Sequence, residues 1–497
     1  MNFQWPSLPE ACYRQWHSSD LRERIALVSD SEQLDYAALA ERTAAAAAAL
    51  VTMGTARGDI VAIAMNRSID AVIAILGALW AGACPCPLDS QLSAGQLRAM
   101  LSAVGAAWIV ADDDHMDCAR DLGYGASRLI AADFSTAAAY RDLDLGPDNR
   151  ALLLFTSGST GHPKGVMLSH RNLLSNADGV IRHTQLTDRD RLLHSMPLHH
   201  TNGLNNQIFA PLLAGATVVL GGRFKADTFP DLVDRHRPTI ITGVPTMYAR
   251  LLDQPFNREA LQGLRMARCG SAPITEDLHR RVEAHMGCDL VVSYGLSEAT
   301  CTSLMNPPGR RRIGTVGTVL HGQQVSLLKP GSSEPVADGE EGEIAISGPS
   351  LMTGYLGADP QADRAVVDGR LRTGDLGRFD ADGYLTITGR LKEVIIRGGE
   401  NLSPQAIEQA LAADPGVRTC CVVGRAHHDL GQVPVAFVVL ADGTPRDADR
   451  LCDLVASSLS RTHRPAEIIF LDALPETSVG KIDRKALATR VKQAADG

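Results

Sequence analysis

The stretch FTSGSTGHPKGV, residues 155–166, places hydroxyl side chains, three glycines and one lysine side by side. Small residues let backbone N–H groups approach a ligand closely, and hydroxyls with one cation add donors suited to a polyphosphate. The apolar run ALLLF before it is typical of a buried strand, and an α/β sheet presents binding loops at its strand ends. A Gly/Ser run alone fits a flexible surface turn equally well. The nucleotide-binding candidates here are Thr156, Ser157, Gly158, Ser159, Thr160, Gly161 and Lys164.

The lysine of this loop does not have the Walker A spacing. In that motif, G-x-x-x-x-G-K-[ST], the lysine directly follows the second glycine. Here Gly161 is followed by His162 and Pro163, and only then by Lys164. The spacing excludes a Walker-type ATPase or kinase, so a different class of enzyme must hold the phosphates.

Several motifs together indicate which class this is. SGSTGHPKGV resembles the phosphate loop of the adenylate-forming superfamily: acyl-CoA synthetases, peptide-synthetase adenylation domains and luciferases. Other family signatures follow in the family's order, from LWAGACPCPLD near residue 80 to GKIDRKAL at 480–487, so the resemblance covers nearly the whole chain. It implies an enzyme that joins a carboxylic acid to AMP and passes the acyl group to a thiol, using ATP and Mg²⁺.

SYGLSEAT, residues 293–300, resembles the family's YGxTE motif. The resemblance implies that Glu298 holds Mg²⁺, with Thr156 as a second metal candidate, and that Ser297 contacts a phosphate. A hard cation that prefers carboxylate and phosphate oxygens makes physical sense of the glutamate. Outside such a motif, a lone glutamate is more often a surface residue. The same stretch adds three candidates for the nucleotide site: Ser293, Tyr294 and Gly295.

Two further stretches resemble the adenosine-binding motifs. RCGSAPI, at 268–274, matches the segment beside adenine, where Tyr294 could stack on the base. In RTGDLG the resemblance implies that Asp375 accepts hydrogen bonds from the ribose hydroxyls and that Arg390 supports the ribose or a phosphate. Without the resemblance, RCGSAPI would be interpreted as a turn after a strand. The candidates beside adenine are Gly270, Ser271, Ala272 and Pro273.

The last third of the chain contains the catalytic candidate and the hinge. Lys481, in VGKIDRKAL, matches the lysine that bridges the substrate carboxylate and the α-phosphate. A cation between two anionic reactants lowers the electrostatic barrier to their reaction. Lys392, in RLKEV, matches the hinge position, and Gly398 with Gly399 match a turn along which pantetheine passes. Alone, RLKEV is a charged turn and a terminal lysine is usually solvated.

SMPLHHTNGLNN, residues 195–206, matches the region where amino-acid adenylation domains carry an aspartate for the substrate ammonium group. It contains no acid, so we expect a carboxylic acid without an α-amine. The resemblance makes His200 a catalytic, gating side chain and places Asn202 and Gly295 at the acyl pocket. His199 is expected to be capped or to face solvent. Fatty, aryl, dicarboxylic and natural-product acids all remain open as substrates.

Coenzyme A is the expected acceptor. Fatty-acyl-AMP ligases that load carrier proteins usually carry an insertion in the large domain, for which this chain has no room. A free-standing acyl carrier protein is the alternative acceptor, and oxidation of the adenylate, as in luciferases, is another outcome. The non-catalytic alternative is a nucleotide-binding switch. Retention of all the charged candidate residues argues against it.

The composition bounds the partners. The 497 residues carry a formal net charge of −9, which argues against nucleic acid as the main partner. The most hydrophobic run, AVIAILGALWAGACPCPL, is broken by glycine and proline and is too short to span a bilayer. The first residues show no signal-peptide pattern. We expect a cytoplasmic protein without membrane insertion, whose ten scattered cysteines are mostly buried thiols.

The order of predicted elements gives the fold class. Helical segments alternate with short β-branched runs, which is typical of parallel sheets flanked by helices. From about residue 320 to 389, short strands between Gly/Asp turns indicate a β-rich subdomain. Ser403 and Pro404 then open a helix of a compact α+β unit. We predict an α/β protein with a large N-terminal AMP-binding domain at 1–389 and a small, mobile α+β lid domain at 390–497, hinged near Lys392.

Overall fold

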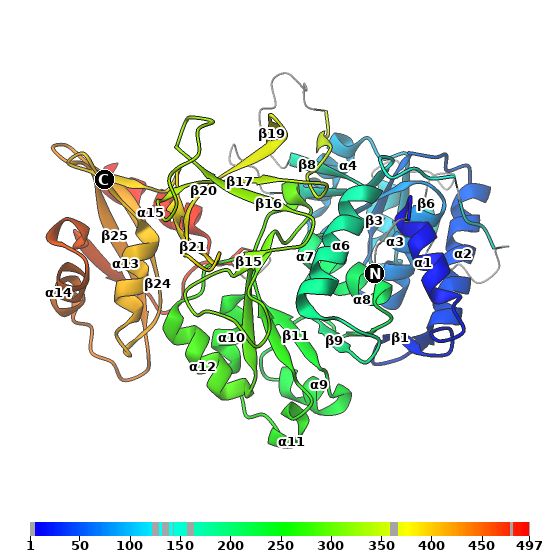
Figure 1. Ribbon diagram of the computed structural model, residues 1–497, viewed down its shortest axis with the longest axis horizontal. Helices are drawn as coiled ribbons and strands as arrows, with labels where there is room; N and C mark the ends of the chain where they lie inside the picture. The colour runs from blue at the N-terminus through cyan, green and yellow to red at the C-terminus, as the bar shows by residue number, and fades with distance from the viewer. Residues whose placement is uncertain are drawn as a thin grey trace.

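The largest sheet of the protein has parallel strands at its centre. The computed structural model describes residues 5–121, 129–131, 139–142, 144–156, 164–357, 366–477 and 481–496. The strands from β13 to β1 run parallel, and those outside them are antiparallel (Figure 1). The nine strands lie in the order β15 (Thr318–Val319), β14 (Leu304–Met305), β13 (Asp289–Tyr294), β12 (Met266–Cys269), β11 (Ile240–Gly243), β9 (Arg191–His194), β10 (Thr217–Leu220), β1 (Ile25–Val28) and β2 (Gln33–Asp35).

Both faces of this sheet are covered. Leu192 and Ile240 join one hydrophobic cluster, whereas the next residues along their strands, Leu193 and Ile241, join a second one. Successive side chains of a strand point to opposite faces, so near-continuous apolar strands are what a doubly covered sheet requires. One face packs on α6 (His170–Thr184) and α8 (Ala210–Leu213). The other packs on α9 (Phe229–His236), α10 (Pro245–Leu251), α11 (Arg258–Leu261) and α12 (Glu276–Met286).

The most hydrophobic run of the sequence, from Ala71 on, forms the helix α3 and the strand β4, and β4 belongs to a second, parallel sheet. Every residue of α3 from Ile69 to Trp80 except Asp70 is buried, and α2 lies so close that a Cβ on Gly77 would be 2.5 Å from the Ala46 methyl. The small side chains of the alanine-rich run in α2 therefore allow α3 to pack closely against it. The elements are β4 (Cys84–Pro87), β3 (Ile60–Ala64), β5 (Trp108–Ala111), β6 (Leu129–Ala131), α1 (Leu8–Trp16), α2 (Tyr36–Thr52), α3 (Ile69–Trp80), α4 (Ala94–Val104) and α5 (Asp113–Asp121).

Two antiparallel sheets form the β-rich part. One contains β16 (Gln324–Leu328), β17 (Gly342–Ser347), β20 (Arg370–Phe379), β19 (Val366–Val367) and β21 (Leu385–Arg390). The other contains β18 (Gly354–Tyr355), β8 (Lys164–Ser169) and β7 (Arg150–Thr156). Pairing of β18 with β8 brings Tyr355 beside the strands that flank the glycine-rich loop.

The C-terminal elements have hydrophobic clusters of their own, formed by residues after Val394 (Figure 1, orange to red). Ser403 caps α13 by accepting a hydrogen bond from Ala406 N–H, as the sequence predicted. The elements are β22 (Ile395–Arg397), β23 (Glu400–Leu402), α13 (Pro404–Ala412), β24 (Val417–His427), β25 (Gly431–Leu440), α14 (Ala448–Ser458), a 3₁₀ helix (Arg461–His463), β26 (Glu467–Phe470) and α15 (Arg484–Asp496).

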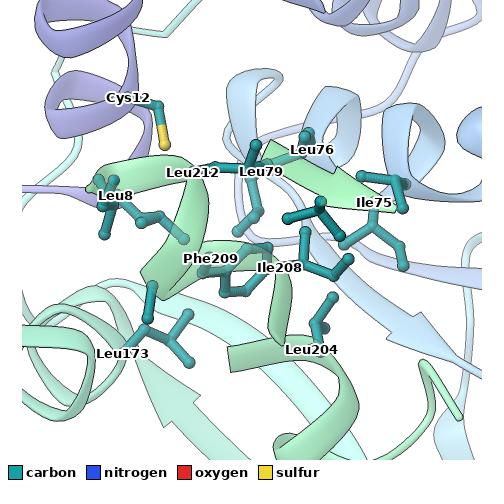
Figure 2. Close-up of a cluster of buried hydrophobic side chains, with 14 of the residues drawn as sticks. Leu8, Cys12, Ile75, Leu76, Leu79, Leu173, Leu204, Ile208, Phe209 and Leu212 are labelled. Atoms are coloured by element: carbon teal, nitrogen blue, oxygen red, sulfur yellow. The ribbon is translucent and has the colours of Figure 1, made fainter. Parts of the chain in front are cut away.

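A short irregular helix joins the core to the edge of the largest sheet. Helix α7 (Thr201–Leu204) continues into a π-helix (Asn205–Phe209), which runs into α8. Figure 2 shows Leu204, Ile208 and Phe209 in the core, with Leu173 of α6 and Leu79 of α3. These apolar contacts fix one side of the segment, so its polar side chains are held at defined positions.

The predicted fold class is confirmed: large parallel sheets flanked by helices, β-rich parts and a small C-terminal α+β unit. The boundary at 389 and the hinge at Lys392 remain predictions. Eight of the nine described cysteines are buried, as expected. Among the residues that the structure describes, none of the helices has both the length and the apolar character needed to cross a membrane.

Candidate active site

Loops that follow neighbouring parallel strands converge at one edge of the largest sheet. The segments containing His200, Gly270 and Gly295 follow β9, β12 and β13, all of which are parallel. Parallel strands place their carboxyl ends at the same edge, where open α/β sheets bind ligands. The sequence candidates from three separate motifs are therefore brought to one place.

Asp375 forms the centre of the first polar group. It lies opposite Arg390 in the β20–β21 pair, and Arg390 Nε donates to its Oδ1 at 2.5 Å. Tyr294 Oη donates to Oδ2 at 2.6 Å. Burial, followed by the charge of Asp375, raises the pKa of the Tyr294 hydroxyl, which stays protonated as a donor. The group is a fixed acceptor beside a cation, suited to the hydroxyls of a ribose.

A second group surrounds Glu298, in a 3₁₀ helix (Ser297–Ala299). Tyr355 Oη donates to Glu298 Oε1 at 2.8 Å, and Lys164 Nζ lies 4.4 Å from the centre of the Tyr355 ring. Lys164 in turn lies opposite Thr156 in the β7–β8 pair. Tyr355 thus connects the glutamate to the base of the glycine-rich loop.

The remaining loop candidates lie outside the described residues. They are Ser157, Gly158, Ser159, Thr160 and Gly161. Tyr355 was not predicted from the sequence. The signal that could have identified it, a two-residue strand paired with β8, is too short to appear as a pattern.

The segment after β12 needs small residues. A Cβ on Gly270 would lie 2.8 Å from Ser293 Oγ, so β12 and β13 approach too closely there for a larger side chain. Ser271 has φ +69°, an uncommon backbone conformation for a residue with a side chain. Ala272 is half-buried and Pro273 is exposed, which makes this a small-residue rim of the site.

Gly295 has no room for a side chain. A Cβ there would lie 1.7 Å from the carbonyl oxygen of Cys301 and 2.7 Å from Thr302 Cα. The chain after Ser297 folds back against it, with Thr300 at φ +69°. This close approach brings the backbone of 301–302 to the pocket next to Gly295.

His200 stands at the N-cap of α7. Burial first, then the neighbouring His199 and the charge of Lys481, lower its pKa to about 3, so the imidazole is neutral at physiological pH. It can hydrogen-bond a substrate without adding charge. Asn202, in α7, lies with its Oδ1 3.5 Å from Asn206 Nδ2.

Of the two alternatives expected for His199, a capped side chain or one that faces solvent, the structure shows a partnered and largely buried side chain. Its side chain is only 17% exposed, and Nε2 lies 3.7 Å from Asp89 Oδ2. Asp89 belongs to the CPCPLD stretch of the second sheet region, so this pair ties that region to the segment carrying His200.

Lys481 lies at the same edge, although it comes from the C-terminal part of the chain. Burial and the charge of Arg390 lower its pKa, while Cys301 raises it. Its charge also lowers the pKa of His200. Lys481 therefore interacts electrostatically with Arg390, Cys301 and His200, and its role between the nucleotide and the acid remains a prediction. Its backbone carbonyl accepts from Thr477 N–H at 2.8 Å.

Two ion pairs join the C-terminal part to the large sheet's helices. Arg250 of α10 donates to Glu476 Oε1 at 2.7 Å, and Arg418 of β24 donates to Asp253 Oδ2 at 2.6 Å. Glu476 is five residues before Lys481, so this contact helps to set where the lysine enters the site.

Gly398 and Gly399 are not part of this gathering. They form the turn between β22 and β23, with φ +58° and +88°, where glycine is favoured. Among the described residues, the position of a Cβ on Gly398 would approach only Leu430, and that on Gly399 would approach nothing within 4 Å. Lys392 is exposed, in the turn between β21 and β22.

The sequence and the fold of the chain match known proteins. The AMP-binding enzyme family matches residues 15–356, and the AMP-binding enzyme C-terminal domain matches residues 406–481. A feruloyl-CoA synthase of an Amycolatopsis species is 36% identical over 458 residues, covering 90% of this chain and 92% of that protein. A sulfoacetate–CoA ligase of Cupriavidus necator is 41% identical over 344 residues, covering 69% of this chain and 67% of that protein.

Solved structures agree over nearly the full length. ATP-bound MatB from Rhodopseudomonas palustris is similar with a TM-score of 0.91 at 30% identity, covering 98% of this chain and 99% of that chain. A benzoate–CoA ligase from Burkholderia xenovorans has a TM-score of 0.88 at 27% identity, covering 97% and 99%. The chain therefore belongs to the AMP-binding enzymes of the adenylate-forming superfamily, in the acyl-CoA synthetase branch.

Proposed function

We propose that this AMP-forming acid–CoA ligase activates a carboxylic acid without an α-amino group, and that Lys481 joins the acid and ATP in the first half-reaction. The observation that carries the proposal is the polar group of Asp375, Arg390 and Tyr294, together with the electrostatic effects that link Lys481 to Arg390 and His200. The absence of any acid in residues 195–206 supports an acid without an ammonium group.

In the first half-reaction, an oxygen of the substrate carboxylate attacks the α-phosphorus of ATP. The bond from that phosphorus to the bridging oxygen breaks, and pyrophosphate leaves. The ammonium of Lys481 neutralises charge where the two anions meet, while Asp375 and Arg390 hold the ribose. Thr156 and Lys164, at the two ends of the glycine-rich loop, steady the outer phosphates. Positioning and charge neutralisation supply most of the acceleration.

The residues at the second group fit a magnesium ion. Carboxylate and hydroxyl oxygens are the donors that Mg²⁺ prefers, and Glu298 and Thr156 would supply them. Among the described residues, Tyr355 is the hydrogen-bond donor to the Glu298 carboxylate, and it uses Oε1. When bound, Mg²⁺ neutralises the triphosphate and makes pyrophosphate a better leaving group.

Glu298→Gln is expected to raise the Mg²⁺ concentration needed for half-maximal ATP–pyrophosphate exchange by about 10–100-fold, because one anionic ligand is lost. The variant retains the acceptor for Tyr355. Exchange is measured against Mg²⁺ concentration, with the exposed Glu334→Gln as the control. An unchanged magnesium requirement in Glu298→Gln would contradict the metal role.

In the second half-reaction, the C-terminal part turns about Lys392, removes Lys481 and brings Gly398 and Gly399 to the pocket. The thiol of coenzyme A attacks the acyl carbonyl, and AMP leaves. One active site then serves two reactions by domain movement. In the present arrangement, Leu430 is the one described residue within 4 Å of a Cβ built on either glycine, which leaves space beside this turn.

The relatives bear names of chemically different acids, from feruloyl and indoleacetate to sulfoacetate. The experiment is therefore acid-dependent ATP–pyrophosphate exchange across fatty, aryl, dicarboxylic and amino acids, followed by addition of coenzyme A. Exchange with a non-amino acid and thioester formation on adding coenzyme A are expected. Exchange limited to amino acids would overturn the proposal, and exchange without a thioester would point to a carrier protein as acceptor.

A further inference from the structure

Arg268 is an unusual residue of β12. The other residues of the strand, Met266, Ala267 and Cys269, are buried and carry no charge. Arg268 is buried with them, at 3% exposure. Arginine is almost never fully buried unless it is paired. A buried guanidinium in the sheet that presents the active site therefore needs a partner.

The described residues do not supply an anionic one. The guanidinium of Arg268 makes one hydrogen bond, from NH1 to the carbonyl oxygen of Asn206 at 3.3 Å, and its Nε has no acceptor. Arg265, just before the same strand, shows the contrast, because it donates to both oxygens of Asp190 at 2.7 and 3.0 Å. Burial lowers the pKa of Arg268 to about 10, which leaves it charged at neutral pH.

Arg268 lies beside segments that adjoin the acyl-pocket candidates Asn202 and Gly295. Burial raises the pKa of the Cys301 thiol, while the charges of both Arg268 and Lys481 lower it, so both cations lie near this thiol. Asn206, whose carbonyl Arg268 contacts, donates from Nδ2 to Thr302 Oγ1 at 2.8 Å. Cys301 and Thr302 belong to the backbone that packs against Gly295, and Asn206 belongs to the π-helix that follows Asn202.

Other polar atoms in the same neighbourhood are also buried without partners among the described residues. They are Asn206 Oδ1, Gln207 Oε1, Thr242 Oγ1 and Ser303 Oγ. A purely apolar acyl group would leave these atoms and the guanidinium without hydrogen bonds, which is costly in a buried site. A polar, charged end of the substrate would satisfy them.

We propose that Arg268 binds a second oxyanion at the far end of the acid, so that the substrate is a dicarboxylic acid or a sulfonated carboxylic acid. The carboxylate near Lys481 is activated, and the second anionic group pairs with the guanidinium. Planar guanidinium geometry suits two-pronged binding of such a group. The inference rests on the proposed acid–CoA ligase function and specifies the substrate class of that site.

The test compares matched acids in ATP–pyrophosphate exchange. Malonate, succinate, glutarate and sulfoacetate are each paired with the monocarboxylic acid that has a methyl group in place of the second acid. We expect at least one diacid or sulfo acid to have a kcat/KM about 100-fold above its methyl partner, because a site built for a polar group rejects the analogue lacking it. 4-Oxopentanoate, compared with succinate, separates a need for charge from a need for a carbonyl.

Arg268→Met keeps the volume and removes the charge. It is expected to lower kcat/KM for the preferred diacid about 100-fold, to change that for the methyl partner by only a few fold, and to leave the KM for ATP unchanged. Arg268→Lys should retain part of the preference. Arg258→Met, an exposed arginine of α11, is the control. If Arg268→Met does not fold, the wild-type pairs and Arg268→Lys still decide.

Three outcomes would overturn the inference. They are a wild-type preference for the methyl acids or the keto acid, an equal loss on both members of a pair in Arg268→Met, and a rise in the KM for ATP alone. In each, exchange with a monocarboxylic acid leaves the ligase function standing. Failure of every acid in the full panel would instead overturn the proposed function itself.

Discussion

Lys481→Ala is expected to slow acyl-adenylate formation by about 10²–10³-fold, the usual effect of removing one donor aimed at charge developing in a transition state. The same variant should form thioester from supplied acyl-AMP and coenzyme A at close to the wild-type rate. The reason is that Lys481, which interacts electrostatically with His200 and Arg390, is proposed to act in the first half-reaction alone.

The two half-reactions are measured separately, as ATP–pyrophosphate exchange and as AMP release from synthetic acyl-AMP. Lys485→Ala is the matched control, because Lys485 is an exposed lysine of α15 only four residues away. Equal losses in both half-reactions would contradict the assigned role and would indicate general damage to the C-terminal part.

Gly399→Leu is expected to have the opposite effect. Adenylate formation should remain within a few fold of wild type, because no described atom lies within 4 Å of a Cβ at this position. Thioester formation from acyl-AMP should fall by about 10²-fold, since a branched side chain would block the path of the pantetheine arm, and a misplacement of about 1 Å at a reacting group costs that much.

The control for Gly399→Leu is a variant that has the same backbone strain at a site away from the proposed path of pantetheine. Gly443, also in a turn of the C-terminal part, has φ +77° and open surroundings, much like Gly399 with φ +88°. Gly443→Leu carries the same strain of a positive φ. Both variants should lose similar stability in thermal unfolding, and only Gly399→Leu should lose thioester formation. If Gly443→Leu lost thioester formation to the same extent, the loss in Gly399→Leu would be due to lower stability and not to a blocked path of the pantetheine arm.

Much of the fold could be predicted because its strands are buried on both faces. The run Ile60–Ala64 is apolar throughout and the run Ile240–Gly243 is fully buried, as expected of strands in a parallel sheet that is covered on both faces. The structure pairs Asp375 with Arg390 across β20 and β21, whereas the roles that the motifs imply for these residues and for Lys481 remain predictions. These candidate residues could be identified from the sequence because each lies in a short, continuous motif.

The missed residues depend on contacts between distant segments. In sequence, Arg265 and Arg268 are two similar arginines around one strand. Only the packed structure shows that the first meets Asp190 while the second has no described carboxylate partner. The π-helix beginning at Asn205 was also not predicted, because one extra residue per turn leaves the apolar spacing nearly unchanged.

The two ion pairs between the C-terminal part and α10 have a further consequence. Arg250 and Glu476 are 52% and 26% exposed, and Arg418 and Asp253 are 49% and 57% exposed. Pairs this open to water contribute at most about 1 kcal/mol each and weaken with added salt. In the proposed alternating mechanism, such weak adhesion would let the C-terminal part leave in every turnover, so that the enzyme is not held in the state that contains its first product.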